Sequence, residues 1–334
     1  MATNRHVLMR DIMLVFTILS RQFYKVMVVF LFFFSAQSTF SIEPILPIPE
    51  SLPHDTAKAA LGKSLFFDVR LSKDDSLSCE SCHFLDRAGV DFVDRSRGIN
   101  NQIVKRNSPT VYNAALNFRQ LWDGRAETLE IQVGKAIKNP KVMGMDSWAD
   151  VVRKLTQAGA YTEKFKKLYG VPMNGENIQH AIAEYERTLL TPNSPFDQYL
   201  NGNKNAISPQ AQKGYQYFKS YGCVSCHQGA NVGGNLFQKV GVLKDINLLE
   251  GFGADMGRFT ITGNEWDKRV FKVPSLRLAV LTPPYFHDGS VKTLREAIDI
   301  MAEFQLGRQV PDEHKDAIIE FLKTLPGEMP ADAK

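Results

Sequence analysis

Apolar residues recur at helical spacing in several separate stretches of the chain, whereas alternating strand patterns are scarce. The first helix is expected at about residues 55–67, after a Pro-rich, extended lead-in over residues 43–56. Another begins at Ser208-Pro209, an N-cap residue followed by Pro at the first helical position, and is expected to continue directly to Cys223. Further helical patterns cover residues 147–169, 177–190, 293–304 and 312–325. The predicted fold class is mainly α with long functional loops.

The N-terminus has a different pattern, in which basic residues precede a short apolar run at residues 26–34 and small polar residues follow it. This order is typical of an export signal, and the run is shorter than the roughly 20 residues that span a bilayer. We therefore expect residues 1–41 to be a signal peptide and the mature protein to be periplasmic. A second apolar patch at residues 12–19 leaves an uncleaved N-terminal anchor as the alternative.

Composition is ordinary for a globular protein, with 44% hydrophobic and 23% charged residues. Removing residues 1–41 takes away four basic residues and Asp11, so the formal charge falls from +4 to +1. Nucleic-acid binding would call for a basic stripe, and none is visible. No nucleic-acid partner is expected.

One pentapeptide pattern occurs twice, as Cys79-Glu80-Ser81-Cys82-His83 and as Cys223-Val224-Ser225-Cys226-His227. C-x-x-C-H is the attachment signal for a c-type haem: the thiols bond to the haem and the imidazole binds the iron. A shared zinc site is disfavoured because each His directly follows its Cys, and a thioredoxin-like site would need a βαβ setting. The chain has no other cysteines. We predict two covalently bound haem c groups.

A predicted helix precedes each motif, which indicates an internal repeat of the small cytochrome c unit. The chain length also favours two domains. We therefore predict two cytochrome c-like domains, each around one haem, at residues 42–200 and 201–334. The boundary is expected near the polar, Pro-rich segment 191–195.

The second axial ligand of each iron decides whether that haem transfers electrons or binds a small ligand. Met301 lies 74 residues after His227 and suits the second haem, although most helical methionines only fill cores. The same rule would nominate Met143 or Met145 for the first haem. Spacing alone leaves open which haem has a free face.

Several separated motifs between about residues 50 and 328 make the chain resemble the bacterial di-haem cytochrome c peroxidases, with their MauG-type relatives. Besides both haem motifs, these are Leu65-Phe66-Phe67-Asp68 with Leu71-Ser72, Arg106-Asn107-Ser108-Pro109-Thr110, Trp122-Asp123-Gly124-Arg125, Thr191-Pro192-Asn193-Ser194-Pro195-Phe196-Asp197, Val232-Gly233-Gly234, Lys272-Val273-Pro274-Ser275-Leu276-Arg277 and Thr282-Pro283-Pro284-Tyr285-Phe286-His287-Asp288-Gly289.

The resemblance implies a division of labour between two haems. The haem on His83 would be the peroxidatic centre, and the haem on His227 and Met301 would take electrons from a donor protein. Trp122 matches a tryptophan between the haems, and Gln132 matches a glutamine of the peroxide pocket. One Ca²⁺ is implied between the domains, held largely through carbonyl oxygens and water at three positions: Asn107, Thr282 and Pro284.

Two departures from the family pattern affect the first haem. No histidine occurs between His83 and His180, where many members have one that caps the resting iron. We therefore expect a first haem that is open without reductive activation. In addition, Val142 stands where the family has a Glu in an N-P-x-E-M-G run. Glu127 and Glu130 lie nearby in sequence, but acids at such positions are mostly solvated.

The leading hypothesis is a periplasmic peroxidase that reduces hydrogen peroxide to water with electrons from a small cytochrome c or cupredoxin. One alternative is a MauG-like oxidase acting on a Trp or Tyr of a partner protein. Another is a di-haem electron carrier in which Met143 or Met145 closes the first haem. Members of this family are often dimeric, which leaves a homodimer open.

Overall fold

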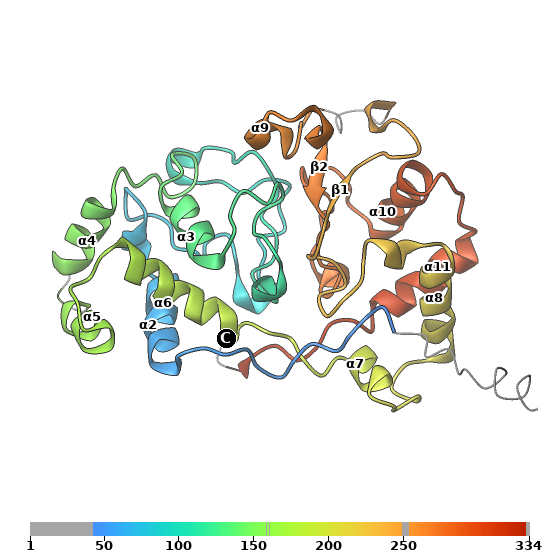
Figure 1. Cartoon of the computed structure of the whole chain (residues 1–334), viewed down its shortest axis with the longest axis horizontal. Coiled ribbons are helices and arrows are strands. Elements are labelled where there is room, and N and C mark those ends of the chain that lie inside the picture. The colour runs from blue at the N-terminus through green and yellow to red at the C-terminus, as the bar shows by residue number, and fades with distance from the viewer. Residues whose placement is uncertain (1–42, 158, 160, 249–253, 332–334) are drawn as a thin grey trace, which may run out of the picture. The chain divides into compact units, whose positions relative to one another are not determined.

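Helices dominate the structure, a computed structural model that describes residues 43–157, 159, 161–248 and 254–331 (Figure 1). The α-helices are α2 (Thr56–Phe66), α3 (Leu129–Ile137), α4 (Trp148–Gln157), α5 (Thr162–Tyr169), α6 (Gly175–Thr188), α7 (Pro195–Leu200), α8 (Pro209–Ser220), α9 (Phe259–Thr262), α10 (Leu294–Ile300) and α11 (Asp312–Leu322). The strands β1 (Phe237–Lys239) and β2 (Val270–Lys272) form one antiparallel pair, in which Gln238 faces Phe271. The mainly helical class is confirmed.

Capping residues fix where the predicted helices begin. The Asp55 side chain accepts hydrogen bonds from the backbone N–H groups of Ala57 and Lys58 at 3.0 and 3.1 Å, so α2 starts at the expected place. Ser208 caps α8 in the same way, with Pro209 at the first helical position.

Two predicted helices end earlier than expected, and a left-handed glycine follows each of them. Residues 147–169 form α4 and α5 rather than one helix, because Gly159 between them has φ of +71°. The helix before the second motif ends at Ser220 and does not continue to Cys223, because Gly222 has φ of +92°. Glycine adopts this conformation without the steric cost of a Cβ atom.

The same helix crossing occurs in both halves of the chain. The helix before the first motif, α2, packs on α6, and the helix before the second motif, α8, packs on α11. A glycine lies at each crossing: a Cβ atom on Gly62 would come within 1.8 Å of the Ala181 carbonyl oxygen, and one on Gly214 within 1.8 Å of the Ala317 carbonyl oxygen. This shared close approach is structural support for an internal repeat.

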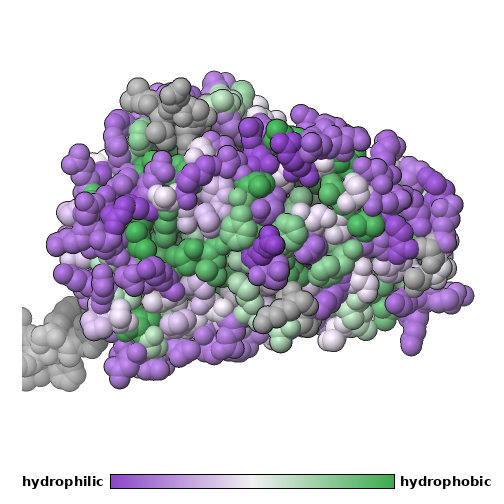
Figure 2. All heavy atoms as spheres, turned by 180° about the vertical axis from the view of Figure 1, so that it is seen from behind, coloured by the Kyte–Doolittle hydropathy of each residue, from purple (hydrophilic) through white to green (hydrophobic). Residues whose placement is uncertain are grey.

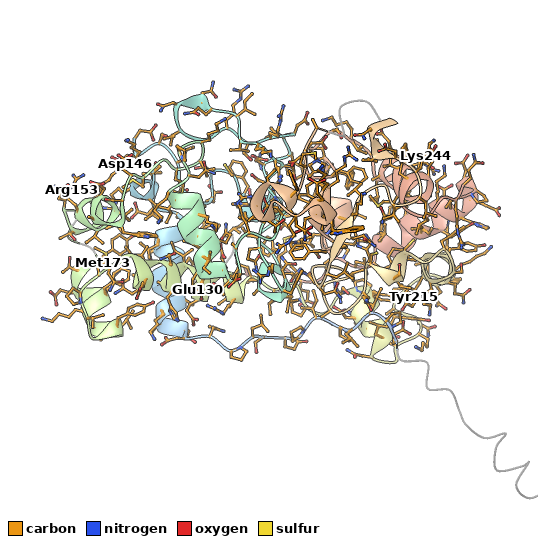
Figure 3. The ribbon with its side chains drawn as sticks, turned by 45° about the horizontal axis from the view of Figure 1, so that its top comes forward. Glu130, Asp146, Arg153, Met173, Tyr215 and Lys244 are labelled. Atoms are coloured by element: carbon orange, nitrogen blue, oxygen red, sulfur yellow. The ribbon has the colours of Figure 1, made fainter. Side chains whose placement is uncertain are left out.

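Each half has its own hydrophobic core inside one unit, Pro44–Lys334. Met173 belongs to the first core and Tyr215 to the second, and Figure 3 shows them on different halves of the ribbon. Polar residues cover most of the face in Figure 2, with apolar side chains gathered near its middle. The division into domains at residue 200 stays a prediction.

The two ends of this unit pack on opposite cores. Ile45, in the extended lead-in, belongs to the second core, from which the chain runs to α2 (Figure 1). Met329, near the other end, packs against the first core. Arg277 fastens the lead-in, because its buried guanidinium donates hydrogen bonds to the Leu46 carbonyl at 2.7 Å and to Asp197 at 2.8 Å. The expected signal peptide lies outside the described residues, among which no helix is long and apolar enough to cross a membrane.

Candidate functional site

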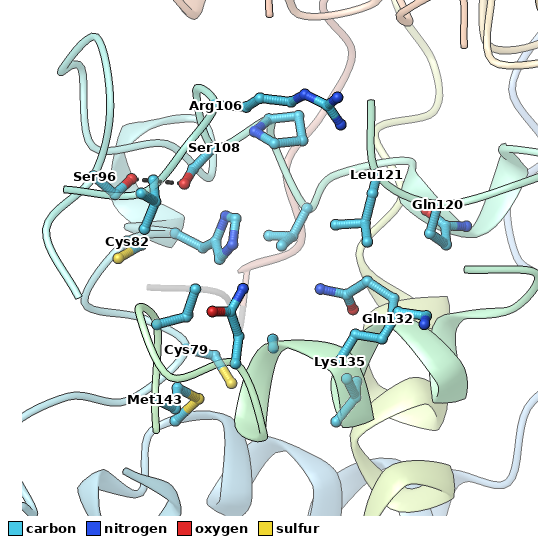
Figure 4. A pocket seen from close by; sticks show the side chains of 18 of the residues that line it. Cys79, Cys82, Ser96, Arg106, Ser108, Gln120, Leu121, Gln132, Lys135 and Met143 are labelled. Atoms are coloured by element: carbon cyan, nitrogen blue, oxygen red, sulfur yellow. Dashed lines mark hydrogen bonds between the residues drawn. The ribbon is translucent and has the colours of Figure 1, made fainter. Parts of the chain in front are cut away.

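A cavity of about 520 Å³, which we call cavity one, lies beside the first C-x-S-C-H motif (Figure 4). Its walls come from the motif loop, from residues 104–111, and from α3 and α6. The predicted site residues among its lining are Cys79, Cys82, His83, Asn107, Trp122 and Gln132. A cavity of this size is typical of cofactor and small-molecule sites.

The His83 side chain is held in one orientation at the wall of cavity one. Its Nδ1 lies 3.2 Å from the Gly89 carbonyl oxygen, so Nδ1–H donates and Nε2 keeps its lone pair. Burial lowers the pKa of His83, which favours the neutral imidazole that binds a metal. Burial also raises the pKa values of Cys79 and Cys82, the latter to about 11.

Gln132 and Val142 both line cavity one. Gln132 lies on α3 with its amide directed into the cavity (Figure 4), and its buried Oε1 has no hydrogen-bond partner among the described residues. Val142 contributes an apolar wall where the family pattern has a carboxylate. His83 is the only histidine among the described residues that line cavity one.

The methionines predicted near the first haem differ in position. Met143 lines cavity one and belongs to the core on which Cys79 packs, and Figure 4 shows it next to Cys79. Met145 is buried in the same core and does not contribute to the described lining. Only Met143 is therefore placed to face a group in cavity one.

The two acids that lie near Gln132 in sequence are engaged elsewhere. Glu127 pairs with Arg119 at 2.8 Å and is largely exposed. Glu130 pairs with Arg187 at 2.5 Å; burial raises the pKa of Glu130, but the hydrogen bonds from Arg187 and Thr128 and the charge of Arg187 together lower it. Neither residue lines cavity one, where sequence reasoning had missed a buried acid, Glu186.

A second cavity of about 200 Å³, cavity two, lies beside the second motif. Cys223, Cys226, His227 and Met301 all line it. The Nδ1 atom of His227 lies 3.4 Å from the Val232 carbonyl oxygen, and burial lowers the pKa of His227 to about 4. The His227 ring is therefore held by a backbone carbonyl and kept neutral by burial, as the His83 ring is.

The chain around Met301 departs from regular α-helix. Met301 follows α10 directly and begins a π-helical turn, Met301–Gln305, a feature that is frequent at functional sites. The structure thus brings the predicted thioether and the predicted imidazole to one cavity. Lys272 also lines cavity two, and burial lowers its pKa to about 8.

Trp122 is the only residue common to the described linings of the two cavities. Its indole N–H donates to the Asn107 carbonyl at 2.9 Å, and its own carbonyl accepts from the Lys272 N–H at 2.8 Å. The ring meets the edge of His287, with centroids 6.4 Å apart. Its position between the motifs agrees with the role that the resemblance implies, which stays a prediction.

The predicted calcium residues lie on two loops that touch. The Asn107 N–H donates to the His287 carbonyl at 2.8 Å, and its side-chain amide donates to the Val93 carbonyl at 3.0 Å. The second loop carries Thr282 and Pro284, the latter after a cis peptide bond. The described residues contain no cluster of His, Cys, Asp and Glu suited to a metal ion, but the predicted set uses other oxygens. Calcium stays a prediction.

Both cavities present the donor set that a c-type haem requires. Each has two thiols that form no disulfide and a buried, neutral imidazole whose Nδ1 is already bonded to a backbone carbonyl. Cavity two adds the Met301 thioether at the π-helical turn, and cavity one has the Met143 thioether in its described lining. The residues present therefore fit haem in both places, and they fit a second axial ligand more clearly in cavity two.

Comparison with known proteins identifies the family. Residues 56–205 match the family model described as di-haem cytochrome c peroxidase. The chain is 44% identical over 290 residues to the cytochrome c551 peroxidase of Nitrosomonas europaea, covering 86% of this chain and 85% of that protein. The chain belongs to the di-haem cytochrome c peroxidase family. Membership implies haem cofactors, and the predicted enzyme class, an oxidoreductase of the cytochrome c peroxidase type, is that of this relative.

Two further proteins that are similar to this chain are a peroxidase and a MauG-like protein. The chain is 45% identical over 285 residues to the cytochrome c peroxidase Ccp of Escherichia coli K12, covering 85% of this chain but only 61% of that longer protein. A crystal structure titled as a MauG-like protein associated with microbial copper homeostasis aligns with a TM-score of 0.75 and 28% identity, covering 87% of this chain and 95% of that one.

Proposed function

We propose that the protein is a periplasmic di-haem cytochrome c peroxidase that reduces hydrogen peroxide to water. Covalent haem at Cys79 and Cys82 would form the peroxide site in cavity one. Covalent haem at Cys223 and Cys226 would lie in cavity two and would receive electrons from a small cytochrome c or a cupredoxin. Peroxidase relatives at 44–45% identity support this activity.

The observation that carries the proposal is the unequal lining of the two cavities. Cavity two contains both an imidazole and the Met301 thioether, which together raise a haem's reduction potential. Cavity one also has an imidazole and a methionine in its described lining, His83 and Met143, but it is larger and adds the Gln132 amide. The larger cavity therefore suits an exogenous oxidant, and the smaller one suits electron transfer.

The chain's own residues would divide the chemistry as follows. A haem bound by His83 would supply the redox-active iron at which peroxide reacts. The Gln132 amide would orient peroxide and water by hydrogen bonds, since its Oε1 is free to accept one. Val142 and Met143 would keep part of the site apolar. Trp122 would lie on the electron route, because it borders both cavities.

Rapid mixing tests this function directly. Fully reduced holoprotein is mixed with hydrogen peroxide in the presence and absence of reduced small cytochrome c, and haem absorbance is followed. A peroxidase should react quickly and then turn over with donor. A sluggish reaction and no donor turnover would indicate an electron carrier instead. A long-lived oxidised state that is not reduced by the donor would favour a protein oxidase.

The MauG-like alternative is supported by one feature, Val142 in place of an acid, and by the likeness to the MauG-like structure. Its substrate would be a Trp or Tyr of a partner protein. Met301 weighs against it, because the resemblance pairs that chemistry with a Tyr ligand at the second haem.

Three further expectations belong to the same proposal. Export through residues 1–41 would place haem attachment outside the cytoplasm, with an uncleaved anchor as the alternative. One Ca²⁺ at Asn107, Thr282 and Pro284 would join the loops that the Asn107–His287 hydrogen bond already brings together. A homodimer is the assembly to test by light scattering of the holoprotein.

A further inference from the structure

Glu186 is a buried acid whose position has no role in the function proposed so far. It lies on α6, only 4% exposed, and lines cavity one together with Gln132. Its Oε2 atom has no hydrogen-bond partner among the described residues, and neither does Oε1 of Gln132. Two buried acceptors without donors at one cavity call for a proton or a polar ligand there.

The cation closest in sequence to Glu186 is engaged by other acids. Arg187 donates to Glu184 at 2.9 Å and to Glu130 at 2.5 Å. Burial first, and then the charge of Glu130, raise the pKa of Glu186 to about 8, although Arg187 lowers it. Besides burial, Glu186 in turn raises the pKa of the Cys79 thiol, a group that no longer titrates once a haem is bonded to it. The carboxyl is therefore protonated at neutral pH and able to donate.

The other carboxyl in the described lining of cavity one cannot take this part. Asp123 accepts hydrogen bonds from Arg106 and, at 2.7 Å, from Arg125. Although burial opposes it, the two guanidinium groups lower the pKa of Asp123 below its ordinary value. Asp123 thus stays ionised and occupied. Glu186 is the only acid of the described lining that can exchange a proton near neutral pH.

We propose that Glu186 is the proton-exchanging acid of cavity one, in place of the carboxylate that is absent at Val142. This inference rests on the proposed peroxidase function and names the residue that the reaction otherwise lacks. General acid–base help of this kind is typically worth about 10²–10⁴-fold in rate.

The proton balance is simple. As the O–O bond of peroxide breaks, the Glu186 hydroxyl gives its proton to the departing oxygen, which leaves as water. The carboxyl recovers a proton from the oxygen that remains, directly or through a water held by Gln132. Overall, one peroxide, two protons from solvent and two electrons from the donor protein give two waters.

The test compares Glu186→Gln with wild-type holoprotein, using Glu127→Gln as a matched control. Glu127 is a largely exposed carboxylate that pairs with Arg119 and does not line cavity one. The rate of the reaction of reduced protein with peroxide should fall about 10²–10⁴-fold in Glu186→Gln and stay near wild type in the control. The wild-type rate should decline about tenfold per pH unit above the acid's pKa of about 8, and this decline should vanish in Glu186→Gln.

Two more readouts separate a proton donor from a merely structural acid. Infrared spectra of the oxidised holoprotein should show a protonated carboxyl band that disappears as pH rises through about 8 and is missing in Glu186→Gln. Adding Val142→Glu to Glu186→Gln should restore at least about tenfold of the lost rate, because it returns a carboxyl to the same cavity.

Unchanged rate and pH profile in Glu186→Gln would overturn the inference, as would a carboxyl band that survives the substitution. The inference would also be overturned if Glu186→Gln lost rate but kept the pH profile of wild type, and if adding Val142→Glu did not restore that rate. If wild type itself does not turn over peroxide with any donor, the proposed function fails instead, and the two failures are thereby distinguishable.

Discussion

Cavity one and cavity two begin from the same five-residue pattern and the same helix crossing, yet they are closed differently. Both present two thiols and an imidazole fixed by a backbone carbonyl. Each also has a methionine in its described lining, Met143 or Met301, but cavity two is smaller, whereas cavity one is larger and adds an amide and a buried acid. Repeated sequence therefore determines how a haem would be attached, and the opposite wall determines what it can do.

The largest expected effect separates the two attachment sites. Replacing Cys79 and Cys82 by Ala should remove one covalent haem and abolish peroxide turnover, while the second haem remains reducible by donor. Replacing Cys223 and Cys226 by Ala should remove the other haem and stop electron entry. Mass spectrometry of the intact protein and haem absorbance measure both results. Loss of the same haem in both variants would contradict the comparison.

The buried acid Glu186 should make the stability of the folded protein depend on pH. The pKa of Glu186 is raised from 4.5 to about 8, so the folded state binds the proton more tightly than the unfolded state. The stabilisation is therefore fully present below the unfolded value and is lost as pH rises through about 8. As pH rises from 4.5 to about 8, the free energy of unfolding of wild type should fall, relative to that of Glu186→Gln, by on the order of a few kcal/mol.

Chemical denaturation of the holoprotein at several pH values measures this difference. Glu127→Gln is the control, since this carboxylate is largely exposed and does not line cavity one, so its removal should not produce the same slope. Parallel curves for wild type and Glu186→Gln would show that the carboxyl is not protonated in the fold.

The thioether should set the potential of cavity two. Met301→Leu keeps an apolar side chain of similar volume but removes the sulfur, so the second haem's reduction potential should fall by on the order of 0.1 V, within the roughly 0.8 V range that axial ligands span. Redox titration followed by absorbance measures this. Met143→Leu in cavity one is the matched control and should leave the potential of the first haem nearly unchanged, unless Met143 closes that haem.

The smallest expected effect comes from restoring an acid at Val142. Val142→Glu, with Glu186 intact, should raise the peroxide rate about tenfold, because a second carboxyl would assist one that already works. Val142→Gln is the control without a titratable proton. Equal rates in all three proteins would show that residue 142 does not face the reacting peroxide.

Sequence reasoning did not recognise Glu186, because a glutamate in a helical pattern is mostly a solvated charge. One signal was available. Glu186 follows the buried residues Ile178 and Ile182 at spacings of four, so it continues the apolar face of α6. The neighbouring Glu184 lies on another face of α6 and pairs with Arg187. From the sequence alone, Arg187 could equally have been expected to pair with Glu186.

The sequence by itself determined the chemistry that is local: two Cys-x-Ser-Cys-His motifs, the helices before them, and a family resemblance built from short motifs. These features depend on neighbouring residues, so spacing reveals them. Only the tertiary structure decided which distant side chains share a cavity. Met301 lines one cavity with His227 and Trp122 borders both, which the family resemblance had already implied, whereas nothing in the sequence analysis placed Glu186 in one cavity with Gln132. Such meetings depend on how helices cross, which residue spacing along a chain does not specify.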